Sequence, residues 1–217
     1  MTAENRNTGK SIPLIKGVTG VILAGGKSSR FGSNKAFADV NGRQLIERVI
    51  AVMGSVFEKL IIITNDPDEY SALGISMYKD LIKGLGPLGG IYTGLEKMPD
   101  RFGFFVACDM PFLNEDLIRY ITEMNKNEYD AVVPKIDWKM EPLHSLYSKT
   151  CLPPIRGLIE SGECMINKFF QTIRTRFINE DEIRQHDPLM RSFYNINRPG
   201  ELIEAVNRES IVLQKND

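Results

Sequence analysis

Residues 21–35 read Val-Ile-Leu-Ala-Gly-Gly-Lys-Ser-Ser-Arg-Phe-Gly-Ser-Asn-Lys, an apolar run that ends at paired glycines and leads into a basic loop. The run 18–23 predicts a buried strand of a parallel sheet, because a strand covered on both faces needs no polar alternation. Gly25 and Gly26 then lie at the carboxyl end of this strand, where open α/β sheets bind their ligands, and lacking Cβ they let backbone N–H groups approach an anion. Three cations follow in the same loop: Lys27, Arg30 and Lys35. The stretch therefore predicts a cradle for a polyphosphate.

The spacing of this loop excludes the two commonest nucleotide-binding motifs. A P-loop requires four residues between its first glycine and a Gly-Lys-Ser/Thr sequence. Gly20 and Gly25 have that separation, but Gly26 stands where the lysine belongs, and the intervening Val-Ile-Leu-Ala is strand rather than loop. The Rossmann fingerprint Gly-x-Gly-x-x-Gly is also missing from this segment.

The composition is that of an ordinary soluble domain. The chain has 217 residues, 42% hydrophobic and 25% charged, which suits one α/β domain with its own core. No apolar run approaches the roughly 20 residues of a membrane span. Residues 1–16 are polar and lack the apolar core of a signal peptide. We expect a disordered leader over 1–16, a single domain over 17–217, a cytoplasmic location and no membrane association.

Charge and metal-binding residue types narrow the class of ligand. The net charge of −1 predicts no general affinity for nucleic acid, whereas residues 1–43 carry seven Lys or Arg residues against two acids. Such a focused positive field suits a small polyanion. The three cysteines are odd in number and widely spaced, and the chain has two histidines, which argues against a disulfide framework or a Cys/His metal centre.

Strand-like and helix-like segments alternate along the chain. The expected strands are 18–23, 59–64, 75–78, 103–107, 130–134, 143–147 and 175–178. The expected helices are 45–53, 87–98, 115–125, 152–160, 165–171 and 199–208. This repeated order predicts an α/β fold with a mostly parallel central sheet and helices on both faces.

A carboxylate follows the predicted strand 103–107, in the sequence Cys108-Asp-Met-Pro111. Asp109 is a hard oxygen ligand beside a phosphate cradle, and Mg²⁺ is commonly held by one or two carboxylates together with phosphate oxygens and waters. The alternative role is a helix cap. Asp109 is too far ahead of Glu115 for that role, which Asn114 fills better.

The loop and this aspartate together resemble known motifs. The signature Leu-Ala-Gly/Ala-Gly-x-x-x-Arg-Met/Phe-Gly-x-x-Lys of the nucleotidyltransferase superfamily matches residues 23–35, and the Leu-Ala-Gly-Gly form is similar to the molybdenum cofactor guanylyltransferase branch. Cys-Asp-x-Pro resembles the metal-binding motif of that branch. The resemblance implies a three-layer α/β/α, Rossmann-like nucleotidyltransferase fold, with Arg30, Lys35 and Asp109 as catalytic residues and Asp109 as the Mg²⁺ ligand. It implies a nucleotide site made of Leu23, Ala24, Gly25, Gly26, Lys35, Asp80 and Asp109.

Two positions in these motifs carry open questions. Asp80 stands before the Gly-Pro-Leu turn, where the resemblance implies a nucleotide contact, and a turn-capping role is the rival. Position 34 is Asn where relatives often have Asp, which bears on how Lys35 is held.

The resemblance extends from Val18 to Leu202 and implies a reaction. GMP would pass from GTP to the terminal phosphate of molybdenum-bound molybdopterin, with release of pyrophosphate. A molybdoenzyme or a chaperone would be the partner that receives the product.

Gly25 favours GTP, because in the related enzymes a Leu-Ala-Ala-Gly form often accompanies CTP. The alternatives are a cytidylyltransferase, a transferase for another phosphorylated acceptor, and a non-catalytic nucleotide-binding regulator. Lys35 together with Asp109 favours an enzyme, since binding alone would not require both.

The second substrate leaves weaker signals. Asn195 and Asn197 lie in a stretch that resembles the closing motif of the family, and their amides could bind a pterin edge or cap the last helix. Asn65 ends the second predicted strand and is left unassigned. His144 is expected to be a packed residue, and Trp138 is a hypothetical cover for the second substrate.

Overall fold

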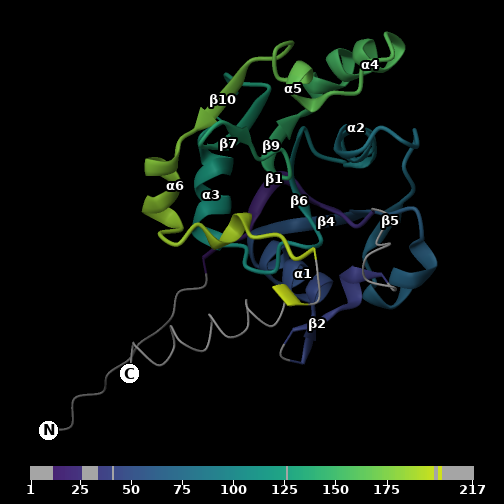
Figure 1. Cartoon of the computed structure of the whole chain (residues 1–217), viewed down its shortest axis with the longest axis vertical. Coiled ribbons are helices and arrows are strands. Elements are labelled where there is room, and N and C mark those ends of the chain that lie inside the picture. The colour runs from purple at the N-terminus through teal and green to yellow at the C-terminus, as the bar shows by residue number, and fades with distance from the viewer. Residues whose placement is uncertain (1–11, 26–33, 41, 126, 198–199, 202–217) are drawn as a thin grey trace, which may run out of the picture.

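The apolar runs of the sequence pair into one sheet in the computed structural model, which describes residues 12–25, 34–40, 42–125, 127–197 and 200–201. In this part of the chain the sheet has eight strands, in the order β10-β7-β9-β6-β1-β4-β5, with β8 paired to β7 (Figure 1). The strands are β1 Ile15–Leu23, β4 Phe57–Ile63, β5 Ser76–Tyr78, β6 Phe102–Ala107, β7 Ala131–Ile136, β8 Lys139–Met140, β9 His144–Ser148 and β10 Thr175–Ile178. A separate hairpin joins β2 Asp39–Val40 to β3 Arg43–Gln44.

Most neighbouring strands are parallel. β1 runs parallel to both β4 and β6, β4 to β5, and β7 to β10, whereas β9 is antiparallel to both β6 and β7. The mostly parallel sheet expected from the strand–helix alternation is confirmed. The reversed direction of β9 is the feature that the alternation did not reveal.

Helices cover both faces of the sheet (Figure 1). The α-helices are α1 Leu45–Val56, α2 Pro87–Lys97, α3 Glu115–Glu123, α4 Leu152–Glu160, α5 Ile166–Phe169 and α6 Glu180–His186. The 3₁₀ helices are η1 Lys35–Phe37, η2 Pro67–Leu73, η3 Lys149–Cys151 and η4 Arg191–Phe193. Helices α1, α3 and α6 pack on one face, and α2, α4 and α5 on the other. This is the expected three-layer α/β/α arrangement. None of the described helices is long and apolar enough to cross a membrane.

The two faces of β1 are both buried, which explains its unbroken apolar run. Ile22 packs into the layer of α1 and α3, whereas Val21 and Leu23 pack into the layer of α2. The second layer lies very close to the sheet, since a Cβ at Gly94 of α2 would come within 2.4 Å of the Phe105 ring. Glycine in α2 therefore lets the helix approach β6, and a Cβ at Gly90 would come within 2.8 Å of Leu23 at the end of β1.

Two differences from the expected elements concern β1 and α6. β1 begins at Ile15, inside the stretch expected as a leader, because Ile15 pairs with Phe57 across an irregularity in register. The short helix α6 was not predicted. Its signal was present in the capping box of Asn179 and Glu182, whose side chains each accept from the other's backbone N–H. The expected closing helix over 199–208 lies almost wholly outside the described residues.

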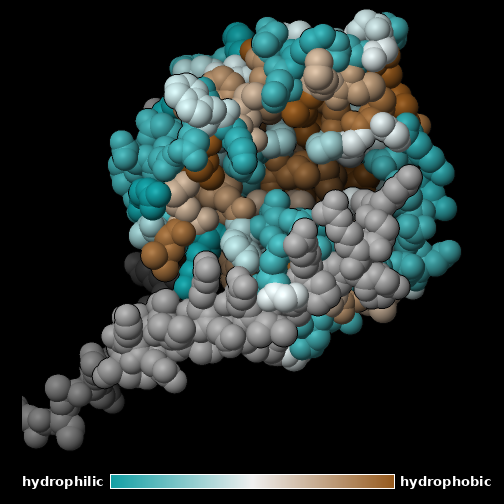
Figure 2. Space-filling view, viewed as in Figure 1, coloured by the Kyte–Doolittle hydropathy of each residue, from teal (hydrophilic) through white to brown (hydrophobic). Residues whose placement is uncertain are grey.

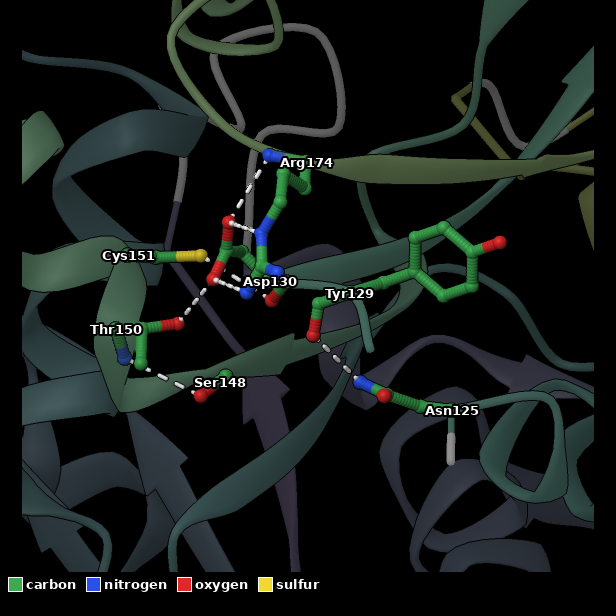
Figure 3. A network of polar contacts seen from close by, with 7 residues as sticks. All are labelled: Asn125, Tyr129, Asp130, Ser148, Thr150, Cys151 and Arg174. Carbon is green, nitrogen blue, oxygen red and sulfur yellow. Dashed lines mark hydrogen bonds and ion pairs between the residues drawn. The ribbon is translucent and has the colours of Figure 1, made fainter. Parts of the chain in front are cut away.

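The carboxylate of Asp130 connects the amino ends of β7 and β10 to the carboxyl end of β9 (Figure 3). Asp130, just before β7, accepts hydrogen bonds from the Thr150 hydroxyl at 2.7 Å and from the Arg174 backbone N–H at 2.9 Å. The Arg174 guanidinium lies 3.4 Å from the same carboxylate. The carbonyl of Asp130 accepts from the backbone N–H of Ser148, at the end of β9, and from the Cys151 thiol. These bonds fix the carboxyl end of β9 here, so β9 begins at the other edge, where β1 and β6 end.

Candidate active site

A cavity of about 1030 Å³ opens at the carboxyl ends of the parallel strands. Its wall includes the residues that end or follow β1, β4, β5 and β6. Figure 2 shows the face beside α2 hollowed, with hydrophobic residues in the depth of the hollow and hydrophilic residues around it. The cavity therefore lies where the strand order predicts a ligand site.

Most of the residues expected at the nucleotide site meet at this cavity. Five of them line it: Leu23, Gly25, Lys35, Asp80 and Asp109. Ala24 lines an adjoining cavity of about 200 Å³. Gly26 and Arg30 lie outside the described residues. Segments far apart in the sequence are thus assembled into one site.

Lys35 and Asp109 form an ion pair in the cavity wall. Lys35 begins η1, and its ammonium contacts Asp109 Oδ2 and also lies 3.4 Å from Asn197 Oδ1. The Asp109 carbonyl accepts from the Ile196 backbone N–H at 3.0 Å, which joins the C-terminal segment to the loop after β6. Asp109 does not cap α3, because Asn114 does so by accepting from the Leu117 N–H.

Asn34 fixes the start of η1 and hence the position of Lys35. Its Oδ1 accepts from the Ala36 N–H at 3.1 Å, and its Nδ2 donates to Glu69 at 2.6 Å and to the Tyr70 hydroxyl at 2.8 Å. An aspartate could not donate to Glu69 and would face it as a like charge. The asparagine at position 34 therefore suits the neighbours that this chain places around it.

Asp109 has one oxygen available for a metal ion. Its Oδ2 contacts Lys35, and its Oδ1 is buried without a hydrogen-bond partner among the described residues. No group of three or more His, Cys, Asp or Glu side chains that could hold a metal occurs in the described part of the chain. Mg²⁺ fits such a site, because it is usually held by one or two carboxylates with phosphate oxygens and waters completing its shell.

Asn65 and Asp80 form a pair that sequence reasoning did not find. They follow the neighbouring strands β4 and β5, and Asn65 Nδ2 donates to Asp80 Oδ2 at 2.8 Å. The amide oxygen Oδ1 of Asn65 and the second carboxylate oxygen Oδ1 of Asp80 are buried and have no partner among the described residues. A buried unpaired acceptor costs about 1–3 kcal/mol. The pair thus holds two acceptors that a ligand carrying two donors would satisfy. The signal in the sequence was that each residue stands two positions after the end of a strand.

The glycine-rich turn before α2 forms another wall of the cavity. Gly86 adopts φ 57° and ψ −143°, a conformation restricted to glycine, and Pro87 then starts the helix. The N-terminus of α2 at this wall carries a partial positive charge. A Cβ at Gly25 would meet no described heavy atom within 4 Å. The described residues therefore impose no steric need for glycine at this position.

The wall on the other side of Asp109 comes from the segments before β9 and after η4. Glu141, Asn195 and Asn197 line the cavity there. Burial raises the pKa of Glu141, and Lys139 opposes this increase. Trp138 is 89% exposed and does not line the cavity, which disfavours the hypothesis that it covers a substrate there.

Two further residues are explained by packing. His144 is fully buried between the rings of Phe104 and Phe193, and burial lowers its pKa to about 3, so it is neutral and serves the core. Burial raises the pKa of Cys108 to about 12, which keeps its thiol protonated and unreactive.

The sequence of this assembled site matches a known family. The family described as MobA-like NTP transferase domain matches residues 20–175, which span the glycine loop, Lys35, Asp80 and Asp109. The chain belongs to this family. It is therefore a nucleotidyltransferase.

Relatives of this MobA-like transferase cover most of its length. A protein of Desulfosudis oleivorans, named molybdenum cofactor guanylyltransferase, is 39% identical over 87% of the chain and 94% of its own length. One of Pelotomaculum thermopropionicum, named probable molybdenum cofactor guanylyltransferase, is 36% identical over 86% of the chain and 91% of its own length.

Solved structures share the fold. The crystal structure of molybdopterin-guanine dinucleotide biosynthesis protein A from Archaeoglobus fulgidus has a TM-score of 0.77 and 26% identity, covering 88% of this chain and 98% of that chain. A 4-diphosphocytidyl-2C-methyl-D-erythritol synthase from Anaerococcus prevotii, 13% identical, has a TM-score of 0.66, covering 89% of this chain and 96% of that chain, and shows the fold alone.

Proposed function

We propose that this MobA-like transferase moves GMP from GTP to the terminal phosphate of molybdenum-bound molybdopterin and releases pyrophosphate. The names of its relatives supply the reaction class. The observation that carries the choice of nucleotide is the pair of unpartnered acceptors on Asn65 and Asp80.

Guanine is the base that fits this pair. Its Watson–Crick edge presents two neighbouring donors, the ring N1–H and the 2-amino group. Cytosine and adenine each present a single exocyclic amino group as donor on that edge. The carboxylate of Asp80 and the amide oxygen of Asn65 would accept one bond each. A cytosine would leave one buried acceptor unpaired, at a cost of about 1–3 kcal/mol.

The phosphates would lie between the glycine loop and the ion pair. Backbone N–H groups near Gly25 would hold phosphate oxygens, as glycine-rich turns do for other anions. Lys35 would neutralise charge on the α-phosphate and on the departing pyrophosphate, together with Arg30. Asp109 Oδ1 is the oxygen that we assign to Mg²⁺, which when bound supplies charge neutralisation across the phosphates.

The chemical step needs no general base from the protein. An oxygen of the acceptor phosphate, already anionic at neutral pH, attacks the α-phosphorus as the bond to the bridging oxygen of pyrophosphate breaks. Positioning and charge neutralisation supply most of the catalysis in such transfers. The buried, neutral state of His144 is therefore compatible with the reaction. Delivery of the product to a molybdoenzyme or chaperone, and a cytoplasmic setting, belong to the same proposal.

The experiment is pyrophosphate release measured with each of the four nucleoside triphosphates, with and without molybdenum-molybdopterin. We expect release that depends on both GTP and the acceptor. Release with CTP in preference to GTP would favour the cytidylyltransferase alternative. Measurable GTP binding without release from any nucleotide would favour a non-catalytic regulator.

A further inference from the structure

One carboxylate at the cavity wall, that of Glu141, has no role in the proposed binding of the nucleotide. Four carboxylates and one described cation line the cavity: Asp66, Asp80, Asp109, Glu141 and Lys35. Asp80 is bonded to Asn65, and Asp109 to Lys35. Asp66 lies on the exposed surface at the start of η2. Glu141 is half-buried, and its carboxylate has no hydrogen bond or ion pair to another described residue. A partly buried, unpaired carboxylate is costly beside a polyanion unless a ligand donates to it.

The reversed direction of β9 brings Glu141 to this edge. Val106, near the carboxyl end of β6, pairs with His144 at the amino end of β9. Because β9 is antiparallel, the residues that precede it lie beside those that follow β6. Glu141 therefore stands at the carboxyl edge of the sheet, near Asp109, and on the side of β6 away from β4 and β5.

The backbone of Glu141 is held rigidly. Its N–H donates to the Pro134 carbonyl at 2.9 Å. Its carbonyl accepts from the Ser145 hydroxyl at 2.6 Å and from the His144 N–H at 3.3 Å. The carboxylate is thus presented at the cavity wall from a fixed backbone, as a recognition group requires.

We propose that Glu141 is a specificity residue for the acceptor substrate, and that its carboxylate accepts the ring N–H and 2-amino donors of the pterin. This inference rests on the proposed function, which supplies a pterin acceptor. A 2-amino-4-oxo ring places two donors side by side, and an ionised carboxylate can accept both with its two oxygens. Asn65 and Asp80 would read the guanine on the β4–β5 side, and Glu141 the pterin on the β9 side, with Lys35 and Asp109 between them.

Guanine carries the same pair of donors, so the test must separate the two rings. We would compare Glu141→Gln with Glu160→Gln, which removes an exposed carboxylate on α4 away from the cavity. Steady-state kinetics would give KM values for GTP and for molybdenum-molybdopterin, and the Mg²⁺ concentration for half-maximal rate. Expected for Glu141→Gln is a rise of roughly 10-fold or more in the acceptor KM, since bonds to a charged acceptor are the stronger ones. The GTP KM and the Mg²⁺ requirement should stay at the wild-type values.

Binding without turnover gives a second readout. Quenching of the intrinsic fluorescence of 6-hydroxymethylpterin would be compared with that of 6-hydroxymethyllumazine, in which a 2-oxo group replaces the 2-amino group. Wild-type protein and Glu160→Gln should prefer the pterin, and Glu141→Gln should lose this preference. Thermal denaturation of each variant would show whether it is folded.

Each other outcome overturns the inference in a distinct way. A higher KM for GTP alone would make Glu141 a guanine contact, and a higher Mg²⁺ requirement would make it a metal ligand. An acceptor KM and a ring preference equal to those of Glu160→Gln would leave Glu141 with no role in recognition. If wild-type protein releases no pyrophosphate from GTP, the proposed function fails, whereas the ring-binding comparison still decides the role of Glu141.

Discussion

The substitution Asp80→Asn tests how the site chooses its base. Asp80 has two carboxylate oxygens, one bonded to Asn65 Nδ2 at 2.8 Å and the other buried without a partner. The variant removes the charge and leaves the side chain nearly the same size. If the free oxygen receives a donor from guanine, the variant weakens one charge-assisted hydrogen bond that CTP does not form.

The expected loss of GTP affinity corresponds to one hydrogen bond, because only one oxygen of Asp80 lacks a partner among the described residues. A hydrogen bond to a charged group contributes about 1.5–3 kcal/mol, which corresponds to a loss of roughly 10- to 150-fold in kcat/KM for GTP. The bond is made before and during the reaction, so the loss should fall mainly on KM. The kcat/KM for CTP should change little, and the preference for GTP over CTP should therefore fall by about the same roughly 10- to 150-fold factor.

The assay is pyrophosphate release at varied GTP and CTP, with Asp66→Asn as the matched control. Asp66 lines the same cavity and loses the same charge, but it is not bonded to Asn65. Equal losses for GTP and CTP in Asp80→Asn would mean that Asp80 supports the site without distinguishing the two bases. A GTP preference equal to that of Asp66→Asn would refute the assignment of the base.

Three other substitutions, the last with a matched glycine control, test the metal ligand, a buried histidine and the packing of α2. Asp109→Asn should reduce Mg²⁺-dependent turnover by about 100-fold or more while GTP still binds, because the change removes charge at the reacting phosphates. His144 has a pKa lowered from 6.5 to about 3 by burial, so only the unfolded chain binds its proton between these pH values. The free energy of unfolding should fall by about 1.4 kcal/mol per pH unit below that upper value, and His144→Leu should remove this contribution in urea denaturation. Gly94→Ala should destabilise by about 1–3 kcal/mol, because its Cβ would lie 2.4 Å from Phe105, whereas Gly157→Ala in α4 meets nothing and should stabilise by up to about 1 kcal/mol.

Each of these has an outcome that would contradict it. Normal turnover of Asp109→Asn at every Mg²⁺ concentration would remove Asp109 from the metal. An unchanged pH slope in His144→Leu would assign the acid sensitivity to other groups, and His186→Gln serves as the control for a histidine outside the core. A rise in the melting temperature of both Gly94→Ala and Gly157→Ala would show that helix propensity, rather than the contact with the sheet, controls stability in α2.

Local sequence determined the order of the strands and helices and the positions of several candidate site residues. The apolar run before Gly25, the breaks at glycine and proline, and the order of strands and helices predicted a mostly parallel sheet with helices on both faces, because burial on both faces and turn chemistry are short-range properties. The same signals placed Gly25, Lys35, Asp80 and Asp109 after strand ends or in the adjoining loop, and the structure brings them to one cavity. What these residues do in the reaction remains a prediction.

Only the tertiary structure decided which residues face one another across that cavity. The pairing of Asn65 with Asp80 depends on β4 lying beside β5, and the place of Glu141 depends on the antiparallel direction of β9. Residue pattern does not encode strand direction here, because a strand buried on both faces looks the same whichever way it runs. Direction is set by non-local hydrogen bonding, including the Asp130 contacts that fix the carboxyl end of β9 at the opposite edge of the sheet.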